Sequence, residues 1–222
     1  MFTGTTYQTC VAPPEWVEVF WLNSDGKPFQ ELAKLQAFLA ASPLKIHMMM
    51  NAGIFEEGGV PCGLTVSNGS ELRPLNTADG KGNFYLKPTG VFFVDPSGAH
   101  VVTSDEYAAL KATPRAATQS GPLLLRAGRM HPKFDPASAS RLHRNGVGIL
   151  PDGRVLFAIT KLVQGKRPNF YEFAKFFESQ GCKDAMFLDG NISRMELEPS
   201  GELATGEKFG AMIVVIEPVE AK

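Results

Sequence analysis

The sequence predicts an α/β fold of the mixed α+β kind, a single compact domain with mixed, twisted sheets flanked by helices. Short apolar runs typical of strands alternate with two amphipathic segments typical of helices. The order strand, helix, strand, polar turn with glycine occurs near the start of the chain and again near its end. The 222 residues suit one core, and no linker rich in Gly and Ser divides them, so we expect residues 1–222 to form one domain.

The first strand–helix–strand unit lies in the first quarter of the chain. Residues 16–22 are rich in aromatic and β-branched side chains, which favour a strand. Residues 29–41 carry leucines and a phenylalanine at helical spacing, and Pro43 ends the predicted helix. Residues 46–50 form a second apolar strand, which the polar turn at residues 51–55 follows.

The middle of the chain is rich in predicted strands. Ser67-Asn68-Gly69 is typical of a hairpin turn, and Asp95-Pro96-Ser97-Gly98 is a second turn with proline at its second position. We expect strands at residues 62–66, 91–94, 99–103 and 123–125, a short helix at 105–111, and a loop at 126–140.

The last third repeats the opening pattern. Pro151-Asp152-Gly153 predicts a hairpin between residues 147–150 and 154–159. Asn169 is a suitable N-cap for a helix over residues 170–180, which has four phenylalanines on one face and Gly181 just past its end. We expect strands at residues 185–188 and 209–216, the second of them central in a sheet.

The two repeated units predict where a site lies. Each ends its second strand in a polar turn, at Asn51-Ala52-Gly53 in the first unit and at Asp189-Gly190-Asn191 in the second. Right-handed crossovers place both turns at the same kind of sheet edge, where open α/β sheets hold their sites. The sequence therefore predicts one composite site, although an Asp-Gly turn is also common without any function.

The composition excludes several classes of partner. The formal net charge is −1, so nothing indicates a nucleic acid or an anionic membrane surface. No apolar stretch approaches the roughly 20 residues that cross a bilayer, so we expect no membrane insertion. The first residues lack the charged and apolar regions of a signal peptide. We expect either a cytosolic protein or an exported one whose leader has been removed.

Neither a metal nor a cofactor is expected. Cys10, Cys62 and Cys182 lie far apart without a C-x-x-C pair, although one disulfide would fit the count in an oxidising compartment. The four histidines lack H-x-x-x-H spacing. The chain also lacks a Walker A sequence, a G-x-G-x-x-G that opens a helix, and H-E-x-x-H. Ser120 is not in a G-x-S-x-G setting, which argues against a nucleophile elbow.

Five polar clusters interrupt the apolar runs and contain the groups that can do chemistry. Amide side chains such as those of Asn51 and Gln119 both donate and accept, which suits sugar hydroxyls. Lys87 and Arg144 are cations that suit a phosphate, and arginine can bind two oxygens at once. Asp189 supplies the carboxylate that glycoside cleavage generally needs. The clusters are at residues 51–55, 87–90, 118–122, 141–146 and 189–195.

Each of these side chains also has a purely structural interpretation. Asn51 would then cap a turn, and Gln119 and Ser120 would bond the backbone of their loop. Lys87 would be a solvated surface lysine, and Arg144 would form an ion pair with Asp135 or Asp152.

Taken together, the motifs resemble those of the phosphodiester glycosidase family. They are N-A-G-I-F at residues 51–55, G-N-F-Y-L-K-P-T-G-V-F-F at 82–93, A-T-Q-S-G-P at 117–122, R-N-G-V-G at 144–148 and L-D-G-N-I-S-R-M at 188–195. The resemblance extends from Tyr7 to Ile216 and is closest to the small bacterial branch of the family. Five motifs in one order make a chance match improbable.

The resemblance implies a hydrolase that cleaves a sugar 1-phosphodiester between the anomeric carbon and the phosphate oxygen, in an envelope or exopolysaccharide glycan. Carried over to this sequence, it implies catalytic roles for Asp189 and Arg144. The expected substrate-binding residues are Asn51, Gly53, Lys87, Gln119, Ser120, Gly121, Asn145, Gly190, Ser193 and Arg194. Members of this branch are generally exported, which implies a periplasmic or extracellular location, with a cytoplasmic one left open.

The chain departs from the wider family in one motif. The sequence D-G-G-G-S, usual in that family, is D-G-N-I-S at residues 189–193 here. Asn191 and Ile192 add bulk where glycine lets a ligand approach the backbone. We expect this change to affect the substrate rather than the fold.

A phosphate monoester is a good leaving group, since its second pKa is about 6. We therefore expect Arg144, aided by Lys87 or Arg194, to hold the departing phosphate, and Asp189 to act as nucleophile or base. Asn51, Gln119 and Ser193 would orient sugar hydroxyls. The competing carboxylates are Glu56 and Glu57, which follow the Asn51 turn, and more weakly Asp184, at the opposite end of its strand from Asp189.

Two alternatives stay open on the sequence alone. One is a non-catalytic module that binds a glycan or a phosphosugar on the same fold, and the other is an enzyme of a different class on this scaffold. A small molecule or a glycan is the expected partner in each case. The sequence names neither the sugar nor its aglycone, and it gives no oligomeric state.

Overall fold

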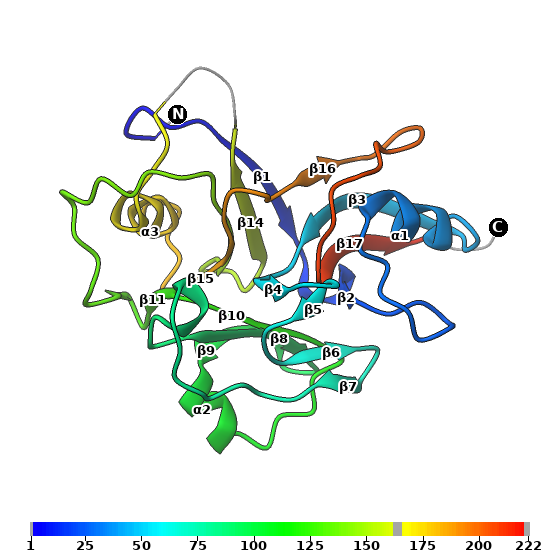
Figure 1. Ribbon diagram of the computed structural model, residues 1–222, viewed down its shortest axis with the longest axis horizontal. Helices are drawn as coiled ribbons and strands as arrows, with labels where there is room; N and C mark the ends of the chain where they lie inside the picture. The colour runs from blue at the N-terminus through cyan, green and yellow to red at the C-terminus, as the bar shows by residue number, and fades with distance from the viewer. Residues whose placement is uncertain (1, 162–165, 220–222) are drawn as a thin grey trace.

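The computed structural model describes residues 2–161 and 166–219, which form three main sheets around a common core (Figure 1). In spatial order the six-stranded sheet contains β1 (Tyr7–Ala12), β14 (Val155–Thr160), β13 (Asn145–Ile149), β15 (Asp184–Asp189), β11 (Leu123–Arg126) and β12 (Arg129–Met130). The five-stranded sheet contains β7 (Ser70–Arg73), β6 (Thr65–Ser67), β10 (Ala116–Ser120), β8 (Gly90–Asp95) and β9 (Gly98–Thr103). The four-stranded sheet contains β16 (Met195–Leu197), β3 (Leu44–Asn51), β17 (Met212–Pro218) and β2 (Val17–Phe20).

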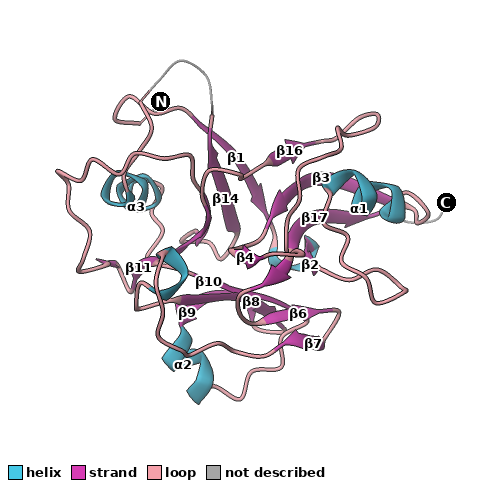
Figure 2. Ribbon diagram, in the orientation of Figure 1, coloured by secondary structure: helices cyan, strands magenta, loops and turns pink. Residues whose placement is uncertain are grey.

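A small hairpin and five short helical segments complete the described chain. The hairpin pairs β4 (Phe55–Glu56) with β5 (Val60–Pro61). The helices are α1 (Leu32–Leu39), α2 (Ser104–Ala109) and α3 (Phe170–Ser179), with 3₁₀ turns η1 (Pro14–Trp16) and η2 (Asn83–Tyr85). Strands outweigh helices, as Figure 2 shows, and the architecture is a sheet-dominated α+β fold.

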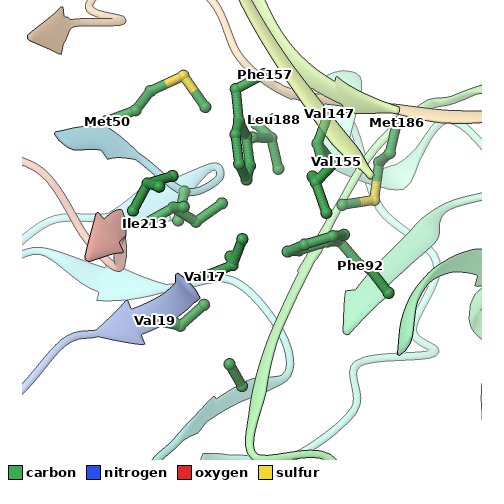
Figure 3. Close-up of a cluster of buried hydrophobic side chains, with 14 of the residues drawn as sticks. Val17, Val19, Met50, Phe92, Val147, Val155, Phe157, Met186, Leu188 and Ile213 are labelled. Carbon is green, nitrogen blue, oxygen red and sulfur yellow. The ribbon is translucent and has the colours of Figure 1, made fainter. Parts of the chain in front are cut away.

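The main core lies between the three sheets. Figure 3 shows Val17 and Val19 of β2, Phe92 of β8 and Phe157 of β14 pointing into this common space. These side chains are at most 1% exposed. The same core includes Met50 and Leu188, the residues immediately before Asn51 and Asp189. Packing of this core therefore fixes the ends of two strands from different sheets.

Helices cover the outer faces of two sheets. Three leucines of α1 pack on the outer face of β3 and β17, and three phenylalanines of α3 pack on the outer face of β14 and β15. The helix α3 begins as predicted at Asn169, whose side chain accepts a hydrogen bond from Glu172 N while the Glu172 carboxylate accepts one from Asn169 N. Gly181, with φ of +85°, follows its end.

The prediction of mixed sheets is corrected in one respect, because every described strand pairing is antiparallel. The apolar runs arise because strands are buried on both faces: Met48 and Met50 of β3 face the central core, whereas Met49 faces α1. Parallel sheets produce the same continuous runs, so the sequence pattern does not distinguish the two pairings.

Both predicted strand–helix–strand units are present. In the first, β2 and β3 run in the same direction with α1 between them in the chain, and β17 is inserted between them in the sheet. In the second, β14 and β15 run in the same direction across α3, with β13 inserted between them. The C-terminal ends of β3 and β15 carry the two polar turns. The central position predicted for the strand near residues 209–216 is also confirmed, since β17 has a neighbour on each side.

The predicted hairpins are confirmed, whereas several strands differ from expectation, among them the short strands β4, β5 and β16, which were not predicted. The strand β1 was not predicted. Residues 118–120 were expected to belong to a polar cluster, yet they lie in β10, where all five residues are buried. The predicted loop at residues 126–140 contains the short strand β12, which a tight turn with positive φ at Ala127 and Gly128 pairs with β11.

Two expectations from the composition concerned a membrane span and a disulfide. No helix within residues 2–161 and 166–219 is long and apolar enough to cross a membrane. Cys10, Cys62 and Cys182 are all free thiols.

Candidate functional site

Asn51 and Asp189, which end β3 and β15, meet where the two sheets adjoin. The Asn51 amide Nδ2 donates a hydrogen bond of 2.8 Å to the Asp189 carboxylate oxygen Oδ2. Asn51 is fully buried and Asp189 is 8% exposed. The two polar turns predicted to form one composite site therefore do lie together.

A second amide, that of Asn145 in β13, holds this pair in place. Its Nδ2 donates to the backbone oxygen and to the side-chain oxygen of Asn51, both at 3.0 Å. Its Oδ1 accepts from the backbone N of Asp189 at 2.7 Å. The backbone N of Arg194 also donates to Asn51 Oδ1, at 3.0 Å. These bonds fix the orientation of Asn51, so that its Nδ2 is directed at the carboxylate.

The environment of Asp189 favours its protonated form relative to an exposed aspartate. Burial raises the pKa of this carboxyl to about 6, because a charge is poorly solvated there. Hydrogen bonds from Gly190 N, at 2.7 Å, and from Asn51 oppose this shift, since they stabilise the carboxylate. Asp189 therefore changes charge close to neutral pH, which suits acid–base or nucleophilic chemistry.

Asp189 lines an open pocket of about 550 Å³. The β4–β5 hairpin contributes the five consecutive residues from Phe55 to Gly59, and the remaining lining residues are Gln30, Ile54, Ile192 and Lys208. Glu56 and Glu57 are both exposed, and Ile192, which stands where the wider family resemblance leads us to expect glycine, is 51% exposed. Asp189 thus lies in a pocket whose lining also carries two carboxylates and a lysine.

Arg144 is not among the residues that line this pocket. It is fully buried under α3, with its guanidinium carbon 3.7 Å from the centre of the Phe170 ring. Its Nε donates to Pro168 O at 3.2 Å and its Nη2 to Ser140 O at 3.0 Å. Burial lowers the pKa of the guanidinium to about 10. Successive side chains along a strand point to opposite faces. Asn145 points towards Asn51 and Asp189, so the Arg144 side chain points to the other face, under α3. The expected contact between Arg144 and the departing phosphate is therefore not supported by this geometry.

The other two predicted cations are engaged elsewhere. Lys87 Nζ contacts the Asp79 carboxylate at 2.8 Å and Thr77 O at 2.9 Å, and it lines a different, very small pocket. The Arg194 side chain pairs with Glu196 at 2.6 Å and with Glu207 at 3.3 Å. Arg194 contributes to the site through its backbone instead.

Neither Gln119 nor Ser120 is among the residues that line the Asp189 pocket. The Gln119 amide oxygen accepts from Leu64 N and Asn76 N, and its nitrogen donates to Asn76 O and to Ser104 Oγ. All its hydrogen-bonding positions are therefore taken by protein groups. Ser120 Oγ donates to Leu188 O at 2.6 Å, which supports the strand that carries Asp189. Their structural interpretation fits these contacts better than sugar binding does.

The predicted glycines differ in how much the structure requires them. A Cβ on Gly121 would lie 2.7 Å from Phe84 O, so no larger residue fits without a backbone shift. Gly53 has φ of +151°, and a Cβ there would lie 3.3 Å from Gln119 O. A Cβ on Gly190 would have no neighbour closer than 3.8 Å.

Ser193 belongs to the loop that follows Asp189 and is 9% exposed. Its backbone N donates to Gly190 O at 2.9 Å, and its carbonyl accepts from His143 Nε2 at 2.9 Å. The His143 ring also bonds the Thr160 hydroxyl through Nδ1 at 2.6 Å, and burial lowers its pKa. His143 therefore joins this loop to Thr160 of β14 through two hydrogen bonds, a role that the spacing of the histidines gave no reason to expect.

The competing carboxylates fall into two groups. Glu56 and Glu57 share the pocket with Asp189. Asp184 is at the other end of β15, where it accepts from Arg126 Nη1 at 2.7 Å and from Ala127 N at 2.8 Å. Among the described residues, no group of three or more His, Cys, Asp or Glu side chains is arranged to hold a metal ion.

Gln30 and Lys208 were not identified from the sequence. Gln30 adopts a positive φ of 60° and donates from Nε2 to Gly58 O at 2.7 Å. It falls within the helix predicted for residues 29–41, but α1 begins only at Leu32. Lys208 lies in the irregular segment before β17. Only the tertiary arrangement brings the two residues beside Asp189.

Comparisons with known proteins agree with this architecture. A family profile described as phosphodiester glycosidase matches residues 45–202. The uncharacterized protein YigE of Escherichia coli (strain K12) is 34% identical over 185 residues, which are 83% of this chain and 70% of that protein.

Two solved structures share the fold at low sequence identity. The catalytic domain of zebrafish N-acetylglucosamine-1-phosphodiester alpha-N-acetylglucosaminidase, auto-inhibited by its pro-peptide, superposes with a TM-score of 0.66 and 15% identity over 95% of this chain and 82% of that one. A hypothetical protein from Synechocystis superposes with a TM-score of 0.56 and 14% identity, over 96% of this chain and 61% of that one.

Proposed function

The chain belongs to the phosphodiester glycosidase family, and from that premise we propose that it is a hydrolase that cleaves the glycosidic bond of a sugar 1-phosphodiester. The proposed substrate is part of an envelope or exopolysaccharide glycan, with a phosphate group between the sugar and the rest of the polymer.

The observation that carries the proposal is the buried carboxylate of Asp189 at the pocket, held by the Asn51 amide at 2.8 Å. Its pKa of about 6 keeps it largely ionised at neutral pH, while burial leaves the charge weakly solvated and therefore reactive. A carboxylate of this kind suits stabilisation of, or attack on, an oxocarbenium-like anomeric carbon.

The proposed reaction breaks the bond between the anomeric carbon and the phosphate oxygen. The electron pair of that bond leaves with the phosphate, which departs as a monoester and needs little proton donation because its second pKa is about 6. Ionised Asp189 either forms the new bond to the anomeric carbon, with water later releasing the sugar, or removes a proton from the attacking water. Both routes require the charge on Asp189.

Glu56 and Glu57 are the candidates for a second carboxylate. They lie on the β4–β5 hairpin that borders the same pocket. In a route through a covalent intermediate, one of them would activate the water of the second step. Substituting each by glutamine would identify which is required.

An assay on purified protein tests the proposal. A sugar 1-phosphodiester such as the methyl phosphodiester of N-acetylglucosamine should yield free sugar, and Asp189→Asn should lower kcat by several powers of ten. Asp184→Asn, which changes the carboxylate at the far end of the same strand, should leave kcat within about threefold. Release of free sugar at the same rate by Asp189→Asn would refute the assignment.

A second candidate function is a non-catalytic module that binds phosphosugars. The exposed Ile192 at the pocket favours it, because its side chain narrows the approach to the backbone after Asp189. This candidate predicts binding of sugar phosphates without release of free sugar. Turnover by the wild-type protein would exclude it.

We also propose an envelope location, since the proposed substrate is a polymer outside the cytoplasm. Fractionation of cells that express the full-length gene product would test this, and recovery of the protein in the cytosolic fraction alone would contradict it.

A further inference from the structure

A phosphate-bearing substrate needs a cation near Asp189, and the three cations expected from the sequence do not provide it. Arg144 is buried under α3, Lys87 pairs with Asp79, and Arg194 pairs with Glu196 and Glu207. None of these three lines the pocket that Asp189 lines. The cation therefore has to come from another part of the chain.

Lys208 is the cationic residue among those that line the pocket. Its side chain is exposed, and within residues 2–161 and 166–219 no carboxylate forms an ion pair with it, although it is close enough to Glu31 to influence that carboxyl. Glu31 itself pairs with Lys34 at 2.6 Å and accepts from Gly206 N at 3.2 Å. The charge of Lys208 is thus available for a ligand.

The backbone beside Lys208 is held firmly. Phe209 is 1% exposed, and its backbone N donates to Gln30 O at 2.6 Å. Phe209 O lies only 2.7 Å from the place that a Cβ on Gly59 would occupy, so the two segments touch directly. Trp21 Nε1 in turn donates to Gly59 O at 2.9 Å. The backbone at Lys208 is therefore fixed beside the pocket, whereas its exposed side chain is free to place the ammonium group against a ligand.

Given the proposed function, we infer that Lys208 holds the phosphate of the substrate while Asp189 faces the anomeric carbon. A phosphodiester carries one negative charge, and Asp189, Glu56 and Glu57 make the pocket unfavourable for an anion unless a cation offsets them. A lysine acts as a compact point charge and suits a phosphate in this role. Lys208 and Gln30 both lie outside residues 45–202, where the family profile matches, so this phosphate subsite is a feature of the flanking segments.

Binding measurements at low ionic strength test the inference. N-acetylglucosamine 1-phosphate and unphosphorylated N-acetylglucosamine would each be titrated into the wild-type protein and its variants. We expect the phosphorylated sugar to bind the wild type at least tenfold more tightly than the plain sugar. Lys208→Gln should abolish that preference, and Lys208→Arg should retain most of it. Lys183→Gln, an exposed lysine before the start of β15, is the matched control and should retain it fully.

Two results would overturn the assignment of Lys208. One is a Lys208→Gln variant that keeps the wild-type preference for phosphate while remaining folded by circular dichroism. The other is a wild-type protein that does not distinguish the phosphorylated sugar from the plain one. A preference for phosphate that depends on Lys208, without any release of free sugar, would instead contradict the proposed hydrolysis and leave the phosphate subsite in place.

Discussion

At the scale of single residues, the site depends on a balance at Asp189 between burial, which raises its pKa, and two hydrogen bonds, which lower it. One of these bonds comes from Gly190 in the same turn, and the other comes from the Asn51 amide nitrogen. Asn145 donates to the Asn51 amide oxygen and so directs the Asn51 nitrogen towards Asp189. The pair of amides thus sets both the position and the ionisation of the carboxylate.

Replacing Asn51 by alanine should move the ionisation of Asp189 in a known direction. Without the Nδ2 donor, the carboxylate loses stabilisation and its pKa rises above about 6. Because the proposed reaction requires ionised Asp189, the acid limb of the pH–rate profile should move to higher pH. Since a hydrogen bond to a charged group is worth about 1.5–3 kcal/mol, kcat at neutral pH should fall by about twofold to tenfold. An acid limb that stays where the wild type has it would show that this hydrogen bond does not control the reacting group.

Asp189 should also make the stability of the protein depend on pH. Its pKa is raised in the folded protein, from an ordinary value of 3.8 to about 6, so the folded state holds the proton more tightly than the unfolded state does. The stabilisation is fully present below pH 3.8 and is lost as pH rises through 6. The total is up to about 3 kcal/mol, at 1.36 kcal/mol per pKa unit.

Chemical denaturation of wild type and Asp189→Asn between pH 4 and 7 measures this effect. The free energy of unfolding of the variant should improve relative to wild type as pH rises, because the variant has no proton to lose at this position. A difference between the two proteins that is constant across this range would contradict the raised pKa.

Gln119 provides a test of structural against substrate-binding roles. Gln119→Ala leaves the backbone N–H groups of Leu64 and Asn76 without their acceptor, at a cost of about 1–3 kcal/mol for each buried group that finds no new partner. We expect a large fall in the free energy of unfolding, whereas Gln180→Ala, at an exposed position, should change it little. A stable Gln119→Ala protein with a raised KM alone would restore the sugar-binding interpretation.

At the scale of elements, α3 is the cover of the six-stranded sheet and of Arg144. Its first residue, Phe170, lies over the guanidinium, and its N-cap Asn169 also donates to Pro136 O and Ser138 O, both at 3.1 Å. One side chain therefore fixes the start of the helix and the loop before β13.

Loss of this cap should cost more than loss of an ordinary one. Asn169→Ala removes the helix cap, worth about 1 kcal/mol, and also the two bonds to the loop, so we expect a loss of roughly 2 kcal/mol or more. Thr103→Ala, at the capping box of α2, removes a cap without such loop contacts and should cost about 1 kcal/mol. If thermal denaturation shows the same loss of stability for both variants, the hydrogen bonds from Asn169 to the loop contribute nothing to the stability of the protein.

The elements that the sequence predicts best are those with a local signal. The aromatic face and caps of α3 and the turn residues of the hairpins are set by neighbours in the chain, and they agree with the structure. The strand β10 was missed because Thr118, Gln119 and Ser120 are polar, whereas their burial depends on partners such as Ala52 O and Leu188 O that lie far away in the sequence.

At the scale of the whole molecule, three sheets share one core, and the candidate site lies where a strand of the four-stranded sheet and a strand of the six-stranded sheet both end. The repeated strand–helix–strand pattern led us to expect Asn51 and Asp189 in one site, and they do meet, but at the ends of strands from two different antiparallel sheets. The pattern did not show which face of the sheet the Arg144 side chain takes. A shift of one residue along the strand moves a side chain from the face at the site to the face covered by α3. Nor does any local pattern place Lys208 at the pocket, since that depends on contacts between Phe209, Gln30 and Gly59.

The most direct test of this account is a crystal structure of the Asp189→Asn variant with an uncleaved sugar 1-phosphodiester. We expect the anomeric carbon to lie within about 3.5 Å of the residue 189 side chain, as a near-attack geometry requires, with the phosphate beside Lys208. A ligand bound in the same pocket with its anomeric carbon turned away from residue 189, or bound at a different surface altogether, would contradict the central claim that Asp189 is the group that acts on the scissile bond.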